Sequence, residues 1–129
     1  MKKTKTLPKL KADLQKIFNE FIRLRDKGKP CISCGQFKEL QSGHFYSVRM
    51  YDALRFRETN AHGECARCNC FDDMHLINYA DNLVKRIGEE EFEMLKFDAK
   101  IYKELGYKWS RSELMELIDE YKQKVKELK

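Results

Sequence analysis

The sequence predicts an α+β fold in which a small cysteine-rich centre lies between helices. Two CxxC pairs, Cys31–Cys34 and Cys65–Cys68, can supply four thiolates to one tetrahedral zinc ion. On both sides of this centre, apolar residues recur at three- and four-residue steps, which is typical of amphipathic helices. Between the two pairs, turn residues and short apolar runs without a helical period predict knuckles and short strands.

Length and composition indicate one small domain, residues 1–129. Because 36% of the residues are charged and only 42% are hydrophobic, the core is modest and a bound metal would add to stability. No apolar run reaches the roughly 18 residues of a membrane span, and no apolar segment of a signal peptide follows the basic first residues. We therefore expect a cytoplasmic protein without membrane contact. Thiols stay reduced there, which favours zinc over disulfides. Cys70 should be a plain thiol, or else compete for zinc.

A basic amphipathic helix is predicted over residues 8–26. Its apolar stripe consists of Leu10, Leu14, Ile17, Phe18, Phe21 and Ile22. Pro8 suits the first turn, and Gly28 with Pro30 ends the helix. The first 29 residues carry ten Lys and Arg against three Asp and Glu, and the polar face of the helix carries Lys9, Lys11, Lys16 and Arg23. This charge favours binding to nucleic-acid phosphates, with a solvated lysine-rich face as the alternative.

A zinc-stabilised core is predicted over residues 30–88. The candidate strands are His44–Tyr46 and Asn60–Glu64. The segment between them interleaves arginines with aromatic residues, namely Arg49, Arg55 and Arg57 with Tyr51 and Phe56. Arginine pairs with phosphate and aromatic rings stack on bases, and Arg67 adds a further cation. The alternative for the aromatic residues is a place in the small core, which we favour for Phe56.

Further helices are predicted after the second cysteine pair. The first has an apolar stripe that ends near Gly88 and consists of Met74, Ile77, Ala80, Val84 and Ile87. Residues 89–129 then form the C-terminal helices, one from Glu89 to about Glu104 and one that begins at Ser110. Ser110 and Glu113 have the spacing of a capping box. Residues 71–129 are acidic overall, so they are less suited to bind a polyanion.

Polar residues in the centre form a second candidate site, with the chemistry of phosphodiester hydrolysis. That reaction needs a base that deprotonates water and a cation that balances charge on the phosphate. His44 is the natural base because imidazole titrates near neutral pH, and Asn60 could position it. Asn69 offers a hard carbonyl oxygen to Mg²⁺. Further candidate ligands are Asp73, four residues later on the same helical face, and His62.

Each of these residues also has a structural role open to it. A single histidine is more often a hydrogen-bonded structural group than a catalyst, and for His75 we favour the structural role. Asn69 could instead cap the helix that follows the second cysteine pair. The catalytic interpretation therefore depends on the whole constellation and not on any one residue.

Taken in order, these motifs resemble the HNH, or ββα-metal, nucleases. The motifs are CxxCG at Cys31–Gly35, Gly43-His44-Phe45, and N-x-H-x-x-C-x-x-C-N over Asn60–Asn69. Within that class, residues from about Phe21 to Ile87 resemble the NinG/Rap recombination endonucleases of lambda-like phages. The resemblance implies a treble-clef-like ββα-metal core. It also implies metal-dependent cleavage of Holliday junctions and D-loops with little sequence preference.

The resemblance implies roles for individual residues. His44 matches the general base, Asn60 matches the asparagine that orients it, and Asn69 matches the last residue of the pattern, which ligates the catalytic cation. Many HNH enzymes have a metal-binding aspartate where this chain has Gly43. His62 or Asp73 would then have to replace that carboxylate.

The sequence thus predicts a metal-dependent, structure-selective DNA endonuclease, with one structural Zn²⁺ per chain and a catalytic Mg²⁺ or Mn²⁺. Branched or duplex DNA would be bound mainly through its backbone, by the basic residues named above. Symmetric cleavage of a junction needs two active sites, so we expect a homodimer that uses the C-terminal helices. A phage- or prophage-encoded protein in the bacterial cytoplasm fits this activity. The alternative is a zinc-containing DNA-binding accessory protein without catalysis.

Overall fold

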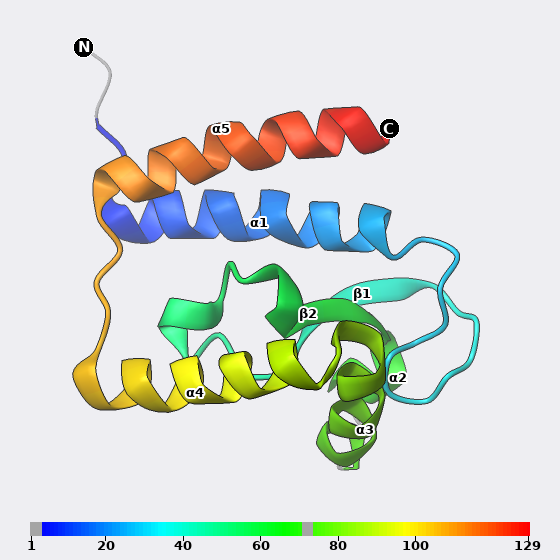
Figure 1. The fold of residues 1–129 in the computed structure, drawn as a ribbon. Helices are drawn as coiled ribbons and strands as arrows, with labels where there is room; N and C mark the ends of the chain where they lie inside the picture. The colour runs from blue at the N-terminus through cyan, green and yellow to red at the C-terminus, as the bar shows by residue number, and fades with distance from the viewer. Residues whose placement is uncertain (1–3, 71–73) are drawn as a thin grey trace.

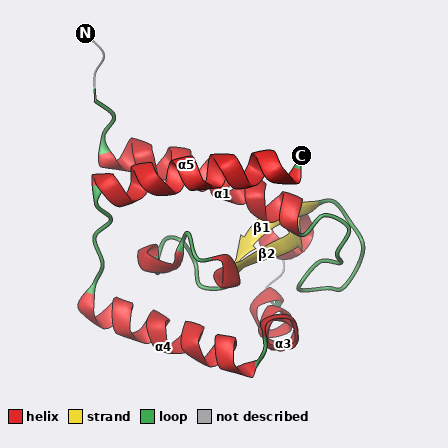
Figure 2. Cartoon of the chain, turned by 45° about the horizontal axis from the view of Figure 1, so that its top comes forward, coloured by secondary structure: helices red, strands yellow, loops and turns green. Residues whose placement is uncertain are grey.

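A two-stranded sheet lies between helices in the computed structural model, which describes residues 4–70 and 74–129 (Figure 1). The elements in order are α1 (Leu7–Arg25), β1 (Leu40–His44), β2 (Ala61–Cys65), α2 (Ala66–Cys70), α3 (His75–Ile87), α4 (Glu89–Leu105) and α5 (Arg111–Leu128). Two short 3₁₀ turns, Asp52–Leu54 and Glu58–Asn60, lie between the strands. Helices α1 and α5 lie on one side of the sheet and α4 lies on the other (Figures 1 and 2). This combination is an α+β fold, as predicted.

Helix α1 begins and ends one residue earlier than the sequence predicted. The Thr6 hydroxyl accepts a hydrogen bond from the amide of Lys9 at 3.3 Å, and Pro8 lies in the first turn. Asp26 follows the last turn and is fully buried. Its carboxylate bonds Arg25 and the backbone amide of Gly63, so it ties the end of α1 to the sheet.

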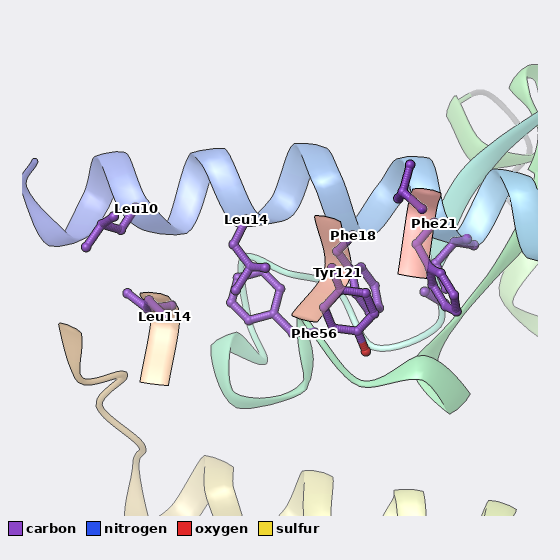
Figure 3. Close-up of a cluster of buried hydrophobic side chains, with 10 residues drawn as sticks. Leu10, Leu14, Phe18, Phe21, Phe56, Leu114 and Tyr121 are labelled. Atoms are coloured by element: carbon purple, nitrogen blue, oxygen red, sulfur yellow. The ribbon is translucent and has the colours of Figure 1, made fainter. Parts of the chain in front are cut away.

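Helices α1 and α5 run in the same direction and enclose the larger core cluster (Figures 1 and 3). The cluster consists of Leu10, Leu14, Phe18, Phe21, Ile22, Phe56, Ala61, Leu114, Tyr121 and Val125. The rings of Phe18 and Tyr121 meet edge to face with centroids 5.2 Å apart. Ser110 and Glu113 form the predicted capping box at the start of α5, and Phe56 lies in the core as we favoured.

The two strands are antiparallel, and their register decides which side chains meet. Gly43 lies opposite His62, and Gln41 lies opposite Glu64. Since side chains alternate between the faces of a strand, these four residues share one face of the sheet. The first strand was predicted at His44–Tyr46 and is found at Leu40–His44. That prediction is wrong because strand pairing overrides the weak β-propensity of the polar Gln41-Ser42-Gly43 stretch.

Helix α3 packs through a different face from the predicted one. Tyr79 and Leu83 are buried in a second cluster with Ile32, Leu54, Leu95 and Ala99. Met74 and Ile77, which the apolar stripe placed inside, are 54% and 57% exposed. The Tyr79 hydroxyl donates to the carbonyl oxygen of Gly43 at 2.6 Å. This bond turns a polar-tipped side chain toward the sheet and leaves apolar residues of α3 on the surface.

Candidate metal centre and active site

Four cysteine sulfurs gather where the loop after α1 meets the end of β2. The Sγ atoms of Cys31, Cys34, Cys65 and Cys68 all lie within 4.8 Å of one another. The Sγ atoms of Cys34 and Cys65 are 3.9 Å apart, close to the roughly 3.8 Å that a tetrahedral zinc with bonds of about 2.3 Å requires. Backbone amides of Cys34 and Cys65 donate to the Cys31 sulfur at 3.5 and 3.3 Å. The four cysteines can therefore hold a zinc ion. Cys70 is exposed and lies outside this group.

His44 ends β1 in a defined protonation state. Its Nε2 lies 3.0 Å from the carbonyl oxygen of Arg55. Because a carbonyl only accepts, Nε2 carries the proton, and Nδ1 of the neutral ring has a free lone pair. Burial lowers the pKa of His44 below its usual 6.5, so the ring is neutral at pH 7. Phe18 of α1 packs beside it, with ring centroids 6.1 Å apart. His44 is thus held in the form that a general base needs.

Asn60 is fully buried and holds the backbone around the histidine instead of its ring. Its side chain accepts from the amide of Tyr46 at 2.9 Å and donates to the carbonyls of Tyr46 and Leu54 at 3.0 and 3.2 Å. Its own carbonyl accepts from Phe45. Asn60 therefore fixes the chain directly after His44 and next to Arg55, whose carbonyl oxygen contacts the ring.

Asn69 lies in α2 with its amide oxygen close to Gly43. Its Nδ2 donates to Oε1 of Gln41 at 2.9 Å, which leaves Oδ1 on the other side of the amide. A β-carbon placed on Gly43 would lie 3.2 Å from that oxygen and less than 3.0 Å from Oε1 of Glu64. Both oxygens therefore face the same small space beside the residue that precedes His44.

Glu64 is a buried carboxylate that sequence reasoning missed. It is fully buried in β2, and its Oε2 accepts hydrogen bonds from the Ser33 hydroxyl and from Nδ1 of His75, the latter at 2.8 Å. Its Oε1 is buried without a hydrogen-bond partner among the described residues. Glu64 lies two residues after His62, so on the predicted strand both side chains point to the same face, and this spacing could have identified Glu64 as a candidate ligand. The register that brings Glu64 to Gly43 was not predictable.

Of the other two proposed ligands of the catalytic cation, His62 lies within the described residues and Asp73 does not. His62 is buried on the same sheet face, with Nδ1 3.4 Å from the Tyr79 hydroxyl. Burial and the positive charge of Arg25 lower the pKa of His62 to about 3, so it is neutral. Asp73 lies outside the described residues.

A cleft of about 670 Å³ opens beside His44 and His75. His44 lines it from β1 and His75 lines it from the start of α3. Its other lining residues come from the loop after β1 and from α3, and they are Phe45, Tyr46, Ser47, Met50, Tyr51, Leu76, Ile77, Ala80 and Asp81. The candidate base and the histidine that bonds Glu64 are therefore accessible from one cleft.

The basic residues predicted to contact DNA fall into two groups. One group is engaged within the chain: Arg55 bonds Gln15 and Asp52, Arg57 pairs with Asp98, Lys11 with Asp52, and Lys9 with Asp13. The other group is exposed, and no ion pair to it is found within residues 4–70 and 74–129; it consists of Lys16, Arg23, Arg49 and Arg67. Arg49 belongs to the loop that lines the cleft. The second group is the better placed to bind phosphate.

Comparisons with known proteins identify relatives among bacteriophages. The family model described as Bacteriophage Lambda NinG protein matches residues 1–129. The chain is 34% identical to protein ninG of Escherichia phage lambda and 35% identical to that of Salmonella phage P22, in each case over 117 residues. Each alignment covers 89% of this chain and 55% of the relative, so the chain spans about half the length of these proteins.

The family of the chain follows from its sequence relatives alone. No solved structure matches the chain. In the described part of the chain, no helix combines the length and apolar character needed to span a membrane. Since the family model matches the chain from its first residue to its last, the chain belongs to the NinG family of bacteriophage proteins.

Proposed function

We propose that the chain is a metal-dependent, structure-selective DNA endonuclease of the HNH class. Its substrates would be branched recombination intermediates such as Holliday junctions and D-loops. The observation that carries this proposal is the position of His44, whose Nε2 bonds the Arg55 carbonyl and whose side chain lines an open cleft. The preceding residue, Gly43, lies against the oxygens of Asn69 and Glu64.

In the proposed reaction, His44 accepts a proton at Nδ1 from the attacking water. The water oxygen bonds to phosphorus and the bond from phosphorus to the 3′ oxygen breaks. The Arg55 carbonyl keeps the tautomer and the ring orientation, and Asn60 keeps the surrounding backbone in place. A bound Mg²⁺ or Mn²⁺, with Asn69 as one ligand, supplies positive charge that stabilises the phosphate and the leaving oxygen.

The order of elements supports the HNH assignment. The antiparallel strands β1 and β2 are followed directly by α2; one cysteine pair precedes this unit and the other lies at the junction of β2 and α2. His44 ends β1, Asn60 precedes β2 and Asn69 lies in α2. A strand–strand–helix unit with a base on one strand and a metal ligand on the helix is the arrangement that the resemblance to HNH nucleases implies.

A cleavage assay tests the proposal directly. Zinc-loaded protein is incubated with an end-labelled four-way junction and with a linear duplex of the same arm sequence, in Mg²⁺, in Mn²⁺ and without either cation. We expect cation-dependent cuts near the branch point and little cleavage of the duplex. Binding of the junction without any cleavage would instead identify a zinc-containing DNA-binding accessory protein.

The homodimer remains a prediction. We expected the C-terminal helices to join two copies, but the apolar face of one of them, α5, is buried against α1 through Leu114, Tyr121 and Val125. Helix α4 keeps apolar surface, since Met94 and Phe97 are 48% and 64% exposed. Helix α5 exposes Met115 and Leu128 as well, at 52% and 46%, so both C-terminal helices keep apolar side chains available to a second copy.

Arg49 should contribute to DNA binding through phosphate contact. Arg49→Ala is expected to weaken junction binding and to lower the slope of log affinity against log salt by about one. Fluorescence anisotropy at several salt concentrations measures both quantities. The melting temperature should not change, because Arg49 is exposed and no ion pair to it is found among the described residues.

Two further variants control this experiment. Lys122→Ala removes an exposed charge from α5 and should leave binding and salt slope unchanged. Arg55→Ala should lower the melting temperature, because Arg55 bonds Gln15 at 2.9 Å and Asp52 at 3.0 Å. An unchanged salt slope for Arg49→Ala would remove this residue from the DNA-binding surface.

A further inference from the structure

We propose that Glu64 is the carboxylate ligand of the catalytic cation, and that it replaces from β2 the carboxylate absent at Gly43. The site then consists of Oε1 of Glu64 and Oδ1 of Asn69, with Gly43 providing the space between them. This inference rests on the proposed nuclease function, because it assigns the cation of that reaction. His62 and Asp73, the ligands suggested by the sequence, are not needed for it.

The first supporting observation is the unsatisfied oxygen of Glu64. The side chain is fully buried, yet Oε1 has no hydrogen-bond partner among the described residues. A buried polar atom without a partner costs free energy, and such atoms in native proteins call for a specific explanation such as a bound ion. A divalent cation at Oε1 would compensate both the missing hydrogen bond and the negative charge.

The second observation is the close approach at Gly43. A β-carbon on this residue would lie 2.8 Å from Cβ of Glu64 and nearer still to its Oε1. Any side chain at this position would therefore displace the Glu64 carboxylate. Gly43 and Glu64 are diagonal neighbours on the same sheet face. One carboxylate can occupy this space, and here it comes from β2.

Both proposed ligand atoms are fixed by other side chains. Ser33 and His75 donate to Oε2 of Glu64, so Oε1 is directed away from them. Gln41 accepts from Nδ2 of Asn69, so Oδ1 is directed toward Gly43. Partners of this kind orient metal ligands and are commonly found around metal sites.

The donor set suits Mg²⁺ or Mn²⁺ better than zinc. It consists of one carboxylate and one amide carbonyl, both hard oxygen donors. Mg²⁺ in enzymes is commonly bound by one or two carboxylates, while waters and substrate phosphate fill the remaining positions. Asn69 is half-buried and Glu64 fully buried, so the site would offer its open side to a phosphate at the surface. The proposed base, His44, directly follows Gly43 in β1, and it lines the same cleft as His75, which bonds Glu64.

Direct measurement of Mn²⁺ binding tests the assignment. Zinc-loaded wild-type protein is titrated with Mn²⁺, and free Mn²⁺ is followed by electron paramagnetic resonance. Glu64→Gln, which keeps the size of the side chain, should weaken Mn²⁺ binding by about 10- to 100-fold with zinc content unchanged. Gly43→Ala should do the same although Glu64 is present, because the methyl group displaces the carboxylate. Glu116→Gln removes an exposed carboxylate from α5, outside the cleft, and should change nothing.

The outcomes separate this inference from the proposed function. Wild-type affinity in both variants, or no Mn²⁺ binding by the zinc-loaded wild type, would overturn the assignment of Glu64. Cleavage of the junction by a Glu64→Gln protein at the wild-type rate would overturn it as well and leave the nuclease function standing. Mn²⁺ binding that depends on Glu64, in a protein that cuts no DNA, would establish the cation site and refute the nuclease.

Discussion

Replacing Cys65 with serine will release zinc and unfold the centre of the molecule. Apparent binding free energies of structural zinc are about 10–16 kcal/mol, as large as the roughly 5–15 kcal/mol that separates a whole native protein from its unfolded state. Cys65 lies at the end of β2, and its amide also donates to the Cys31 sulfur. Without zinc, the loop that holds Cys31 and Cys34 is joined to β2 only by weaker contacts, such as the hydrogen bond from the Ile32 amide to the Gly63 carbonyl at 3.0 Å.

Metal analysis and amide hydrogen exchange measure this effect. The wild type should contain about one zinc per chain, and Cys65→Ser should contain far less, with protection lost in β1 and β2. Cys70→Ser is the matched control, since Cys70 is exposed and lies outside the group of four. It should keep both zinc and protection. A folded, zinc-free Cys65→Ser protein would contradict the structural role of the metal.

His44→Ala should lower the rate of junction cleavage by about 10²- to 10⁴-fold, which is the usual contribution of a general base. Junction binding should remain, because the base acts on water. Single-turnover cleavage with saturating protein separates the two effects. Some loss of thermal stability is expected too, as the ring packs on Phe18 and donates to the Arg55 carbonyl at 3.0 Å.

The pH dependence gives an independent test of the same residue. Burial places the pKa of His44 below 6.5, and the base form exists above the pKa. The cleavage rate of the wild type should therefore fall only as the pH drops below 6.5. Glu116→Gln, which changes an exposed residue of α5 outside the cleft, should keep this profile. Wild-type cleavage by a folded, zinc-loaded His44→Ala protein would exclude His44 as the base.

Local sequence signals were sufficient for the parts of the fold that depend on local physics. The apolar period of α1, with Pro8 at its start, placed that helix within one residue of its ends. The spacing of Ser110 and Glu113 identified the start of α5. The two CxxC motifs bring four sulfurs together, as predicted. Each motif is a local turn that presents two thiols, and a tetrahedral zinc site needs the thiols of both motifs.

Tertiary contacts decided the features that sequence reasoning missed. The prediction of the buried face of α3 was wrong because apolar periodicity takes only apolar side chains into account. Helix α3 instead directs Tyr79 and His75 toward polar groups of the sheet. The contact between His44 and the Arg55 carbonyl depends on a backbone atom, which no residue pattern reveals. Glu64 was missed because its role depends on the strand register, which places it diagonally across from Gly43.

The parallel packing of α5 on α1 has a consequence for the order in which this protein folds during synthesis. Leu114, Tyr121 and Val125 form one wall of the core whose other wall is α1. Contacts between segments so far apart in sequence form late and slow the folding of a chain. The apolar stripe of α1 therefore has no complete partner until residue 125 has left the ribosome. The zinc-binding hairpin needs nothing beyond Cys68, so zinc can organise the centre before α5 is available to cover α1.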